Sequence, residues 1–368
     1  MKNTVIMKPY LFMLSVVLLL FSCHPEDGMD GAMGPQGPEG IQGSKGDPGE
    51  DAAAAAITAY GKWEVISGDF IIDHSKYIYI NEDNTIDILA EDALGFKSDL
   101  ATNVLVTENQ LTLSGGEMGS SINNYRIEGD NMTIFPPYET DPIVMARRPN
   151  DNEASNWIKN IAILNEGDVS WGRDVDITFD GTYILGYDET ERQILKIDPD
   201  DFTVAETIAT PNTAYVVEIE KSNTPQRQLF QTDDGYAQFK SYIYASNDPY
   251  FTSIEIGPWI KGIASVAPGY LWASSSNNSA LYHYKSNGSL TPGEILETIP
   301  LDFQPEGLDF QDGFLYVTER NRVHKCETSP NFRAVETFKL TGGNVKGIAY
   351  DGSDFWLSTR TWAEYGSF

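Results

Sequence analysis

From residue 176 onward, one unit of about 40 to 45 residues recurs, and this repeat constrains the fold more than any other feature of the chain. Each copy holds an apolar segment, a tight turn that contains glycine and an aromatic segment. Third and fourth strand-like segments follow in three of the copies. Such short strands cannot bury their apolar side chains alone, so the copies must pack against one another. The units begin at Asp176, Gly262, Gly307 and Gly347.

Four strands in each unit at this period predict the blades of a β-propeller over residues 157–368. The units resemble propellers of the YVTN, NHL and lactonase class, because the Trp-Asp and Gly-His marks of WD40 repeats are missing. A further unit is expected between residues 211 and 259. There, residues 242–245 and 252–256 match its second and third strands.

The last unit reaches only its second strand before residue 368. Residues 157–164 form an apolar segment that is placed to supply one of the missing strands. We therefore predict about five blades. A sixth would need residues 157–173 and 212–240 to contribute more strands.

Ahead of the repeat, residues 57–137 predict a smaller antiparallel barrel or meander, which makes the chain all-β. Strand-like segments alternate with turns, most clearly at residues 77–80 and 85–89. Gly61-Lys62-Trp63 resembles the Gly-x-Trp signature of lipocalin-like barrels, in which the tryptophan closes the barrel floor. About 80 residues is short for an eight-stranded lipocalin, which leaves open whether the domain has a ligand cavity. Residues 138–156 follow Pro136-Pro137, contain two further prolines and predict a linker.

The N-terminus predicts a secretory signal over residues 1–22, because two lysines precede an apolar run that is short for a membrane span. Its end, Leu20-Phe21-Ser22-Cys23, resembles the bacterial lipobox. The resemblance implies that Cys23 becomes the lipidated first residue of the mature protein and anchors it to the outer membrane. Residues 24–27, which end in the acidic pair Glu26-Asp27, resemble the surface-export signal of Bacteroidetes lipoproteins, which implies display on the cell surface.

Glycine occupies every third position from Gly28 to Gly49, giving eight Gly-X-Y triplets within a predicted stalk over residues 23–51. Only glycine fits at the axis of a collagen triple helix, and the stretch resembles the collagen-like segments of bacterial lipoproteins. Two interpretations remain open. Residues 28–51 form a homotrimeric triple helix, or they form a single-chain spacer of roughly 70 Å at about 3.1 Å per residue.

The charge of the chain excludes one class of partner. The chain carries 54 acidic against 25 basic residues and a formal net charge of −29. Nucleic acids require clustered lysine and arginine, so we expect no nucleic-acid partner. Apart from Cys23, the only cysteine is Cys326, so no intrachain disulfide can form after lipidation, and a buried thiol is expected.

Candidate site residues come from the propeller pattern. Residues that enter the innermost strands line one mouth of the central channel in a propeller, and here they lie near Val175, Lys261, Glu306 and Lys346. Glu306 and Asn321 resemble metal ligands of gluconolactonase-type propellers, which would place a divalent cation between them. Lys261 and Lys346 would repel such a metal. We therefore predict polar ligand contacts at Lys261, Glu306, Asn321 and Lys346, with no cofactor.

The leading hypothesis is a non-catalytic surface lipoprotein whose β-rich head binds an extracellular glycan or protein. The first alternative is a metal-dependent propeller hydrolase of the lactonase type, and whether the protein is an enzyme stays open. The second is a trimeric, collagen-like structural or adhesion protein.

Overall fold

The computed structural model describes residues 3–7, 58–114, 120–137, 141–151, 156–164, 166–169, 176–188, 190–209, 216–221, 228–232, 238–243, 248–255, 260–285 and 293–360. Across these ranges the chain is all-β. Cys23, the Gly-X-Y stalk and most of the predicted signal lie outside the described residues. Among the described residues, no helix has the length and apolar character needed to cross a membrane.

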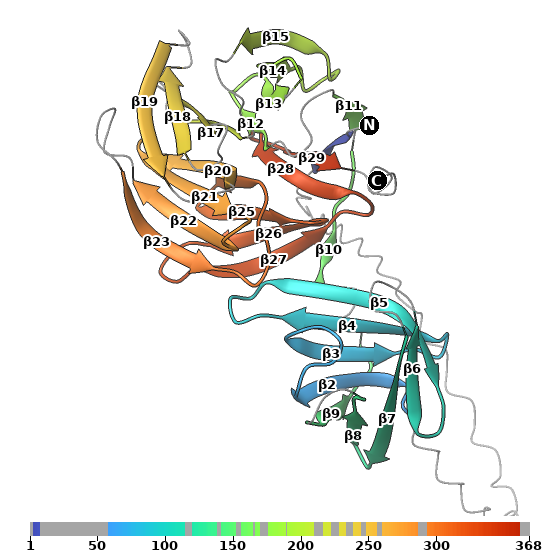
Figure 1. Ribbon diagram of the computed structural model, residues 1–368. Helices are drawn as coiled ribbons and strands as arrows, with labels where there is room; N and C mark the ends of the chain where they lie inside the picture. Colours follow the sequence, from blue (N-terminus) through green and yellow to red (C-terminus); the bar gives the residue numbers. More distant parts are fainter. Residues whose placement is uncertain are drawn as a thin grey trace, which may run out of the picture. The chain divides into compact units, whose positions relative to one another are not determined.

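The first domain is a closed barrel of eight antiparallel strands (Figure 1). Each strand pairs with its neighbour in the sequence, and the last closes the barrel by pairing with the first. The strands are β2 (Gly61–Ser67), β3 (Ser75–Ile80), β4 (Thr85–Glu91), β5 (Lys97–Val106), β6 (Gln110–Ser114), β7 (Ser120–Glu128), β8 (Asn131–Phe135) and β9 (Ile143–Arg148).

Strand β9 corrects the predicted domain boundary at residue 137, because it lies inside the stretch that was interpreted as a linker. Asp141-Pro142 precedes this strand and Pro149 follows it, so the turn signals bracket a strand of six residues. Strand β9 closes the barrel by pairing with both β2 and β8. Without it, these two strands would be open edges with unpaired backbone groups.

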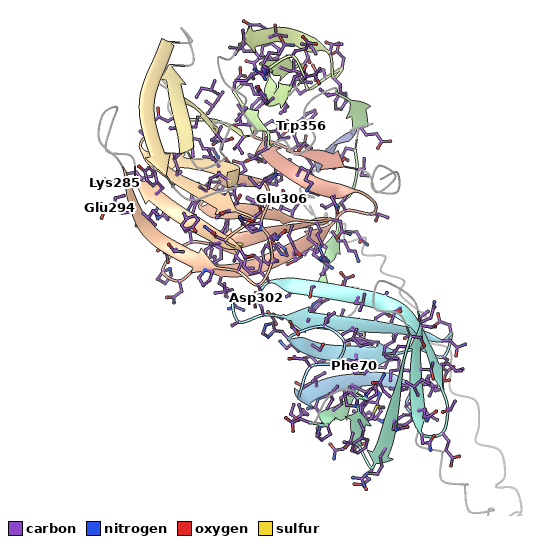
Figure 2. All side chains as sticks on the ribbon, viewed as in Figure 1. Phe70, Lys285, Glu294, Asp302, Glu306 and Trp356 are labelled. Carbon is purple, nitrogen blue, oxygen red and sulfur yellow. The ribbon has the colours of Figure 1, made fainter. Side chains whose placement is uncertain are left out.

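The barrel interior holds a packed hydrophobic core. Trp63 is fully buried there, and its indole Nε1 donates a hydrogen bond of 2.7 Å to the main-chain oxygen of Ala59. The guanidinium carbon of Arg147 lies 4.2 Å from the centre of the Trp63 ring, which adds a cation–π contact. Phe70 points into the same core (Figure 2). The place where the lipocalin resemblance would put a ligand is therefore filled by these side chains.

The rest of the described chain forms five further sheets, in which each inner strand pairs outward with its successors. The first three are β12 (Thr178–Phe179), β13 (Ile184–Asp188), β14 (Gln193–Ile197) and β15 (Val204–Ala209); β16 (Val217–Ile219), β17 (Gln228–Thr232), β18 (Gln238–Ile243) and β19 (Asp248–Glu255); and β20 (Ile260–Ala267), β21 (Tyr270–Ser275), β22 (Ala280–Lys285) and β23 (Glu294–Pro300).

The fourth and fifth sheets also recruit strands from distant parts of the sequence. The fourth has β24 (Leu308–Gln311), β25 (Phe314–Glu319), β26 (Arg322–Glu327) and β27 (Arg333–Lys339), and β10 (Lys159–Asn160) adds in parallel to β27. The fifth has β28 (Asn344–Tyr350), β29 (Phe355–Arg360), β1 (Asn3–Met7) and β11 (Glu166–Asp168).

The innermost strands close the five sheets into a ring. Strand β12 contacts β16, β16 contacts β20, β20 contacts β24, and β24 contacts β28. Strand β28 in turn contacts β12 (Figure 1). This arrangement is a β-propeller, as the repeat predicts. The turns between first and second strands depend on glycines with positive φ, among them Gly313 at 84° and Gly352 at 104°.

Two strand predictions differ from the structure. Residues 242–245 and 252–256 overlap the third and fourth strands of the second sheet, β18 and β19, and not its second and third. Residues 159–160 pair with β27 of the fourth sheet, whereas 157–164 were expected to complete the last one. Strand type and length are readable from the sequence, but the pairing partner depends on tertiary contacts.

Strand β1 belongs to the segment predicted as a secretory signal. It pairs antiparallel with β29, with Val5 opposite Leu357 and Ile6 opposite Trp356. Its other edge pairs with β11. Strand β1 therefore covers the edge of β29.

A single carboxylate holds the inner strands together at the propeller axis. Asp176 is fully buried, and its two oxygens accept hydrogen bonds from the main-chain N–H groups of three other sheets. Ile263 N and Leu308 N donate to Oδ2 at 3.1 and 3.5 Å. Ile348 N donates to Oδ1 at 3.3 Å. Each of these N–H groups directly follows the glycine that begins its unit.

Those glycines are required by the close approach of the strands. A Cβ added to Gly307 would lie 2.6 Å from Asp176 Oδ1, from the Cα of Gly347 and from the main-chain oxygen of Lys346. A Cβ on Gly262 would lie 2.6 Å from the main-chain oxygen of Glu306. Asp176 therefore occupies space that glycine leaves free, and it fills the axis at this level.

We expect Gly307→Ala to lower the free energy of unfolding by about 2 kcal/mol or more, because overpacking against backbone atoms has no flexible neighbour to absorb it. Urea unfolding followed by tryptophan fluorescence measures the effect. Gly313→Asn is the matched control in the same sheet, since nothing lies within 4 Å of a Cβ there and asparagine tolerates positive φ. Equal unfolding midpoints for the two variants would contradict the close-approach argument.

Candidate functional site

The structure brings together two of the residues predicted at the channel mouth. Lys346 Nζ lies 2.6 Å from Glu306 Oε1, and both side chains are mostly buried. Figure 2 places Glu306 among the inner strands of the propeller. Lys261 lies at the start of β20 and is half-buried, and Val175 lies outside the described residues. The Glu306 carboxylate thus forms an ion pair with the ammonium group of Lys346.

Asn321 lies elsewhere, in the turn between β25 and β26. Its Nδ2 donates a hydrogen bond of 3.2 Å to the main-chain oxygen of Leu340, and the residue lines a pocket described below. Among the described residues, no group of three or more histidine, cysteine, aspartate or glutamate side chains is arranged to hold a metal ion. The ligand contacts predicted at Lys261, Glu306 and Lys346 remain predictions. Asn321 lines a separate pocket, which is a different candidate site.

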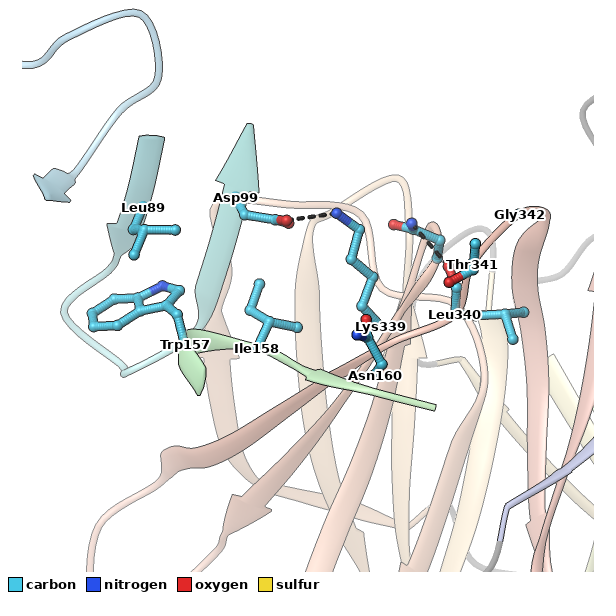
Figure 3. A pocket seen from close by; sticks show the side chains of 10 residues that line it. Leu89, Asp99, Trp157, Ile158, Asn160, Lys339, Leu340, Thr341 and Gly342 are labelled. Atoms are coloured by element: carbon cyan, nitrogen blue, oxygen red, sulfur yellow. Dashed lines mark hydrogen bonds and ion pairs between the residues drawn. The ribbon is translucent and has the colours of Figure 1, made fainter. Parts of the chain in front are cut away.

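A pocket of about 390 Å³ joins residues from three parts of the chain (Figure 3). The barrel contributes β4 and β5, and the segment around β10 contributes one wall. The fourth sheet contributes the turn between β25 and β26, the end of β27 and the connection from β27 to β28. Its volume falls within the ~300–1,000 Å³ typical of small-ligand pockets. The lining residues are Leu89, Asp99, Trp157, Ile158, Asn160, Asn321, Lys339, Leu340, Thr341 and Gly342.

One wall of the pocket is aromatic. Trp157 and Ile158 are buried against Tyr79 and Leu89 on the outside of the barrel. The ring of Tyr77 meets the Trp157 ring edge-on, with 5.8 Å between the ring centres. The indole Nε1 of Trp157 is buried and has no hydrogen-bond partner among the described residues. The wall therefore offers an apolar surface to the pocket.

The opposite side of the pocket is held by an ion-pair network on Asp99 of β5. Lys339 Nζ lies 2.5 Å from Asp99 Oδ2, and an Arg322 guanidinium nitrogen lies 2.9 Å from Oδ1. Burial by itself would raise the pKa of Asp99, but the hydrogen bonds from Lys339 and Arg322 outweigh it and hold the pKa below its ordinary value of 3.8. Asp99 is therefore ionised at neutral pH.

Neighbouring contacts fix β5 and its preceding turn in place. Phe96 packs into the core of the third and fourth sheets, with Phe303 4.8 Å and His324 4.9 Å away between ring centres. The main-chain N–H of Ala334 donates to the oxygen of Leu94 at 2.8 Å. Because both elements that carry Asp99 and Lys339 are pinned, the polar groups of the pocket are preorganised.

A second polar cluster lies near the axis, at Glu218 of β16. Its Oε1 accepts a hydrogen bond of 2.8 Å from the main-chain N–H of Ser265. Burial raises the pKa of Glu218 to about 8, with Lys221 opposing the shift and Asp309 adding to it. Burial likewise raises the pKa of Asp176 well above its ordinary value. Lys221 Nζ pairs with Asp309 at 2.9 Å.

The sequence carried partial signals for these residues. Asp176 begins its unit at the position where three other units have glycine. This difference between the repeats was the sequence signal for the residue at the axis. Glu218 lies in the unit between residues 211 and 259, for which the sequence pattern predicted only a second and a third strand. Asp99, Trp157 and Lys339 had no signal, because they come from separate segments that only the folded chain brings together. Cys326 is buried, as expected.

No protein-family model matches the chain, and no curated protein is detectably similar to it. Among solved structures, the WD40 β-propeller domain of Doa1 aligns with 82% of this chain and 90% of its own at 9% identity, with a TM-score of 0.37. Virginiamycin B lyase from Staphylococcus aureus aligns with 82% of this chain and 95% of its own at 14% identity and a TM-score of 0.33. BamB from Moraxella catarrhalis aligns with 80% of this chain and 85% of its own at 10% identity and a TM-score of 0.29. With TM-scores this low, no argument about function rests on these similarities.

The raised pKa of Glu218 predicts that the native protein loses stability as pH rises from about 4.5 to about 8. In that window the folded state keeps a proton that the unfolded chain releases, so the free energy of unfolding falls with pH. Thermal unfolding midpoints measured from pH 5 to 8 should fall less in Glu218→Gln than in the wild type. The exposed Glu327→Gln is the control and should keep the wild-type slope. An unchanged slope in Glu218→Gln would contradict the assignment.

Proposed function

We propose that the protein is a non-catalytic surface lipoprotein whose β-rich head binds an extracellular glycan. The pocket at β5, β10 and the turn after β27 carries this proposal. Amide groups of Asn160 and Asn321 and the hydroxyl of Thr341 can share hydrogen bonds with sugar hydroxyls. Trp157 supplies the apolar wall that the faces of sugar rings pack against.

The anchoring part of the proposal rests on the sequence. Cys23 with its lipobox resemblance gives attachment to the outer membrane, and the acidic pair Glu26-Asp27 that follows it favours export to the surface. Residues 28–51 separate the head from the membrane, as a single-chain spacer or as a trimeric triple helix. The five sheets of the described chain are proposed to be the full set of blades.

Processing at Cys23 would remove strand β1 and leave the edge of β29 uncovered. Phe355, Trp356 and Leu357 are buried in the unprocessed chain. We propose that another segment of the mature protein covers this edge.

The hydrolase alternative has less support. Its metal would need Glu306 and Asn321 together, whereas Glu306 pairs with Lys346 and Asn321 bonds to Leu340. A bound ammonium group at Glu306 opposes a divalent cation at the same carboxylate.

We expect lipid attachment to require Cys23. Cells grown with an alkyne-labelled fatty acid should give labelled wild-type protein and unlabelled Cys23→Ala, because only the thiol at this position can be lipidated after processing. Cys326→Ala serves as the control and should label like the wild type. Labelling of Cys23→Ala at the wild-type level would overturn the anchor.

We expect the full-length, detergent-solubilised protein to bind a subset of polysaccharides on a glycan array. Asn160→Ala and Thr341→Ala should each weaken that binding about fivefold, in line with ~1 kcal/mol for one hydrogen bond. Asn331→Ala, an exposed residue in the turn before β27, is the control and should bind like the wild type. Equal binding by all three variants would remove the pocket from the proposal.

A further inference from the structure

Basic side chains gather at and beside the pocket, although the chain as a whole is strongly acidic. Lys339 and Asp99 are its charged lining residues, and Arg322 joins them from β26. Two cations on one carboxylate leave a net positive charge at this wall. In a chain with 54 acidic and 25 basic residues, such a local excess is unexpected for a solvated surface.

Lys339 has donors to spare for a ligand. Its ammonium group carries three N–H bonds, and Asp99 takes one of them. The side chain is about one-third exposed, whereas that of Arg322 is only 10% exposed. Lys339 is thus the cation that an incoming group can reach, and Arg322 keeps Asp99 ionised and in place behind it.

A third cation lies over the aromatic wall. Lys97 Nζ is 4.6 Å from the centre of the Trp157 ring, and none of the carboxylates described in the structure forms an ion pair with it. Lys76 Nζ also approaches the Trp157 ring, at 5.5 Å, but it pairs with Glu91 at 2.8 Å. Lys97 therefore keeps its charge available beside the pocket.

We propose that the pocket takes an acidic saccharide, one whose carboxylate is bound by Lys339 and Lys97 while its ring packs on Trp157. This inference rests on the proposed glycan-binding function and specifies the ligand class. The cations supply charge complementarity, and the amides of Asn160 and Asn321 meet the hydroxyls. A neutral sugar would leave Lys97 without an anionic partner, and Lys339 would pair with Asp99 alone.

Calorimetric titration with two matched disaccharides tests the proposal. Digalacturonic acid and α-1,4-galactobiose differ only in the oxidation state of C6. The full-length, detergent-solubilised protein should bind digalacturonic acid at least tenfold more tightly at low salt. The preference should shrink towards onefold at 0.5 M NaCl, because salt screens charge attraction.

Variants separate the charge effect from loss of structure. Lys97→Gln should reduce the preference for digalacturonic acid severalfold with little effect on the thermal midpoint. Lys97→Arg keeps the positive charge and should keep the preference. Lys339→Gln should also reduce it, and its thermal midpoint shows whether the Asp99 network survives. Lys285→Gln on β22 is the control and should leave the preference unchanged.

Equal affinity for the two sugars, or tighter binding of galactobiose, would overturn the acidic-ligand inference while leaving a glycan-binding function in place. Binding of neither sugar would also overturn it. In that case the array comparison of Asn160→Ala and Thr341→Ala decides the proposed function independently.

Discussion

The hydrogen bonds to Asp176 are the interaction on which the propeller depends. One carboxylate accepts N–H groups from three sheets, and three glycines let the strands come close enough to donate them. A buried carboxylate without these donors would be costly. The axis is consequently filled at this level, and a ligand cannot pass along it there. The pocket of the described chain lies instead at the periphery of the ring.

The pocket at the periphery depends on a second constraint, the fixation of strand β5. Phe96 packs among the aromatic residues of the third and fourth sheets, and Asp99 pairs with Lys339 and Arg322. Trp157 packs on the outer face of the barrel from the other side. The barrel thus acts as a structural part of the site, because its own interior is filled by a core around Trp63.

Much of the fold could be predicted because it follows local patterns. Alternating apolar residues at 77–80 and 85–89 predicted strands β3 and β4 of the barrel, whereas β9 lies between two prolines and was missed. The repeat predicted the propeller, since four strands in each unit must pack on neighbours. Pairing partners could not be predicted, as β10 illustrates: two residues far from β27 in the sequence add to its edge. Of the candidate site residues, Glu306 and Lys346 were placed together, whereas Asn321 contributes to another pocket.

The sequence alone determined the all-β class, the repeat, the acidic charge and the Gly-X-Y triplets, because each follows from the residues without knowledge of the fold. The tertiary structure decided which strands share a sheet and that Asp176 fills the axis. It also brought Asp99, Trp157 and Lys339 to one pocket. These three side chains come from three separate segments, and no pattern in any one segment depends on the others. Their meeting is a consequence of packing, which only the folded chain specifies.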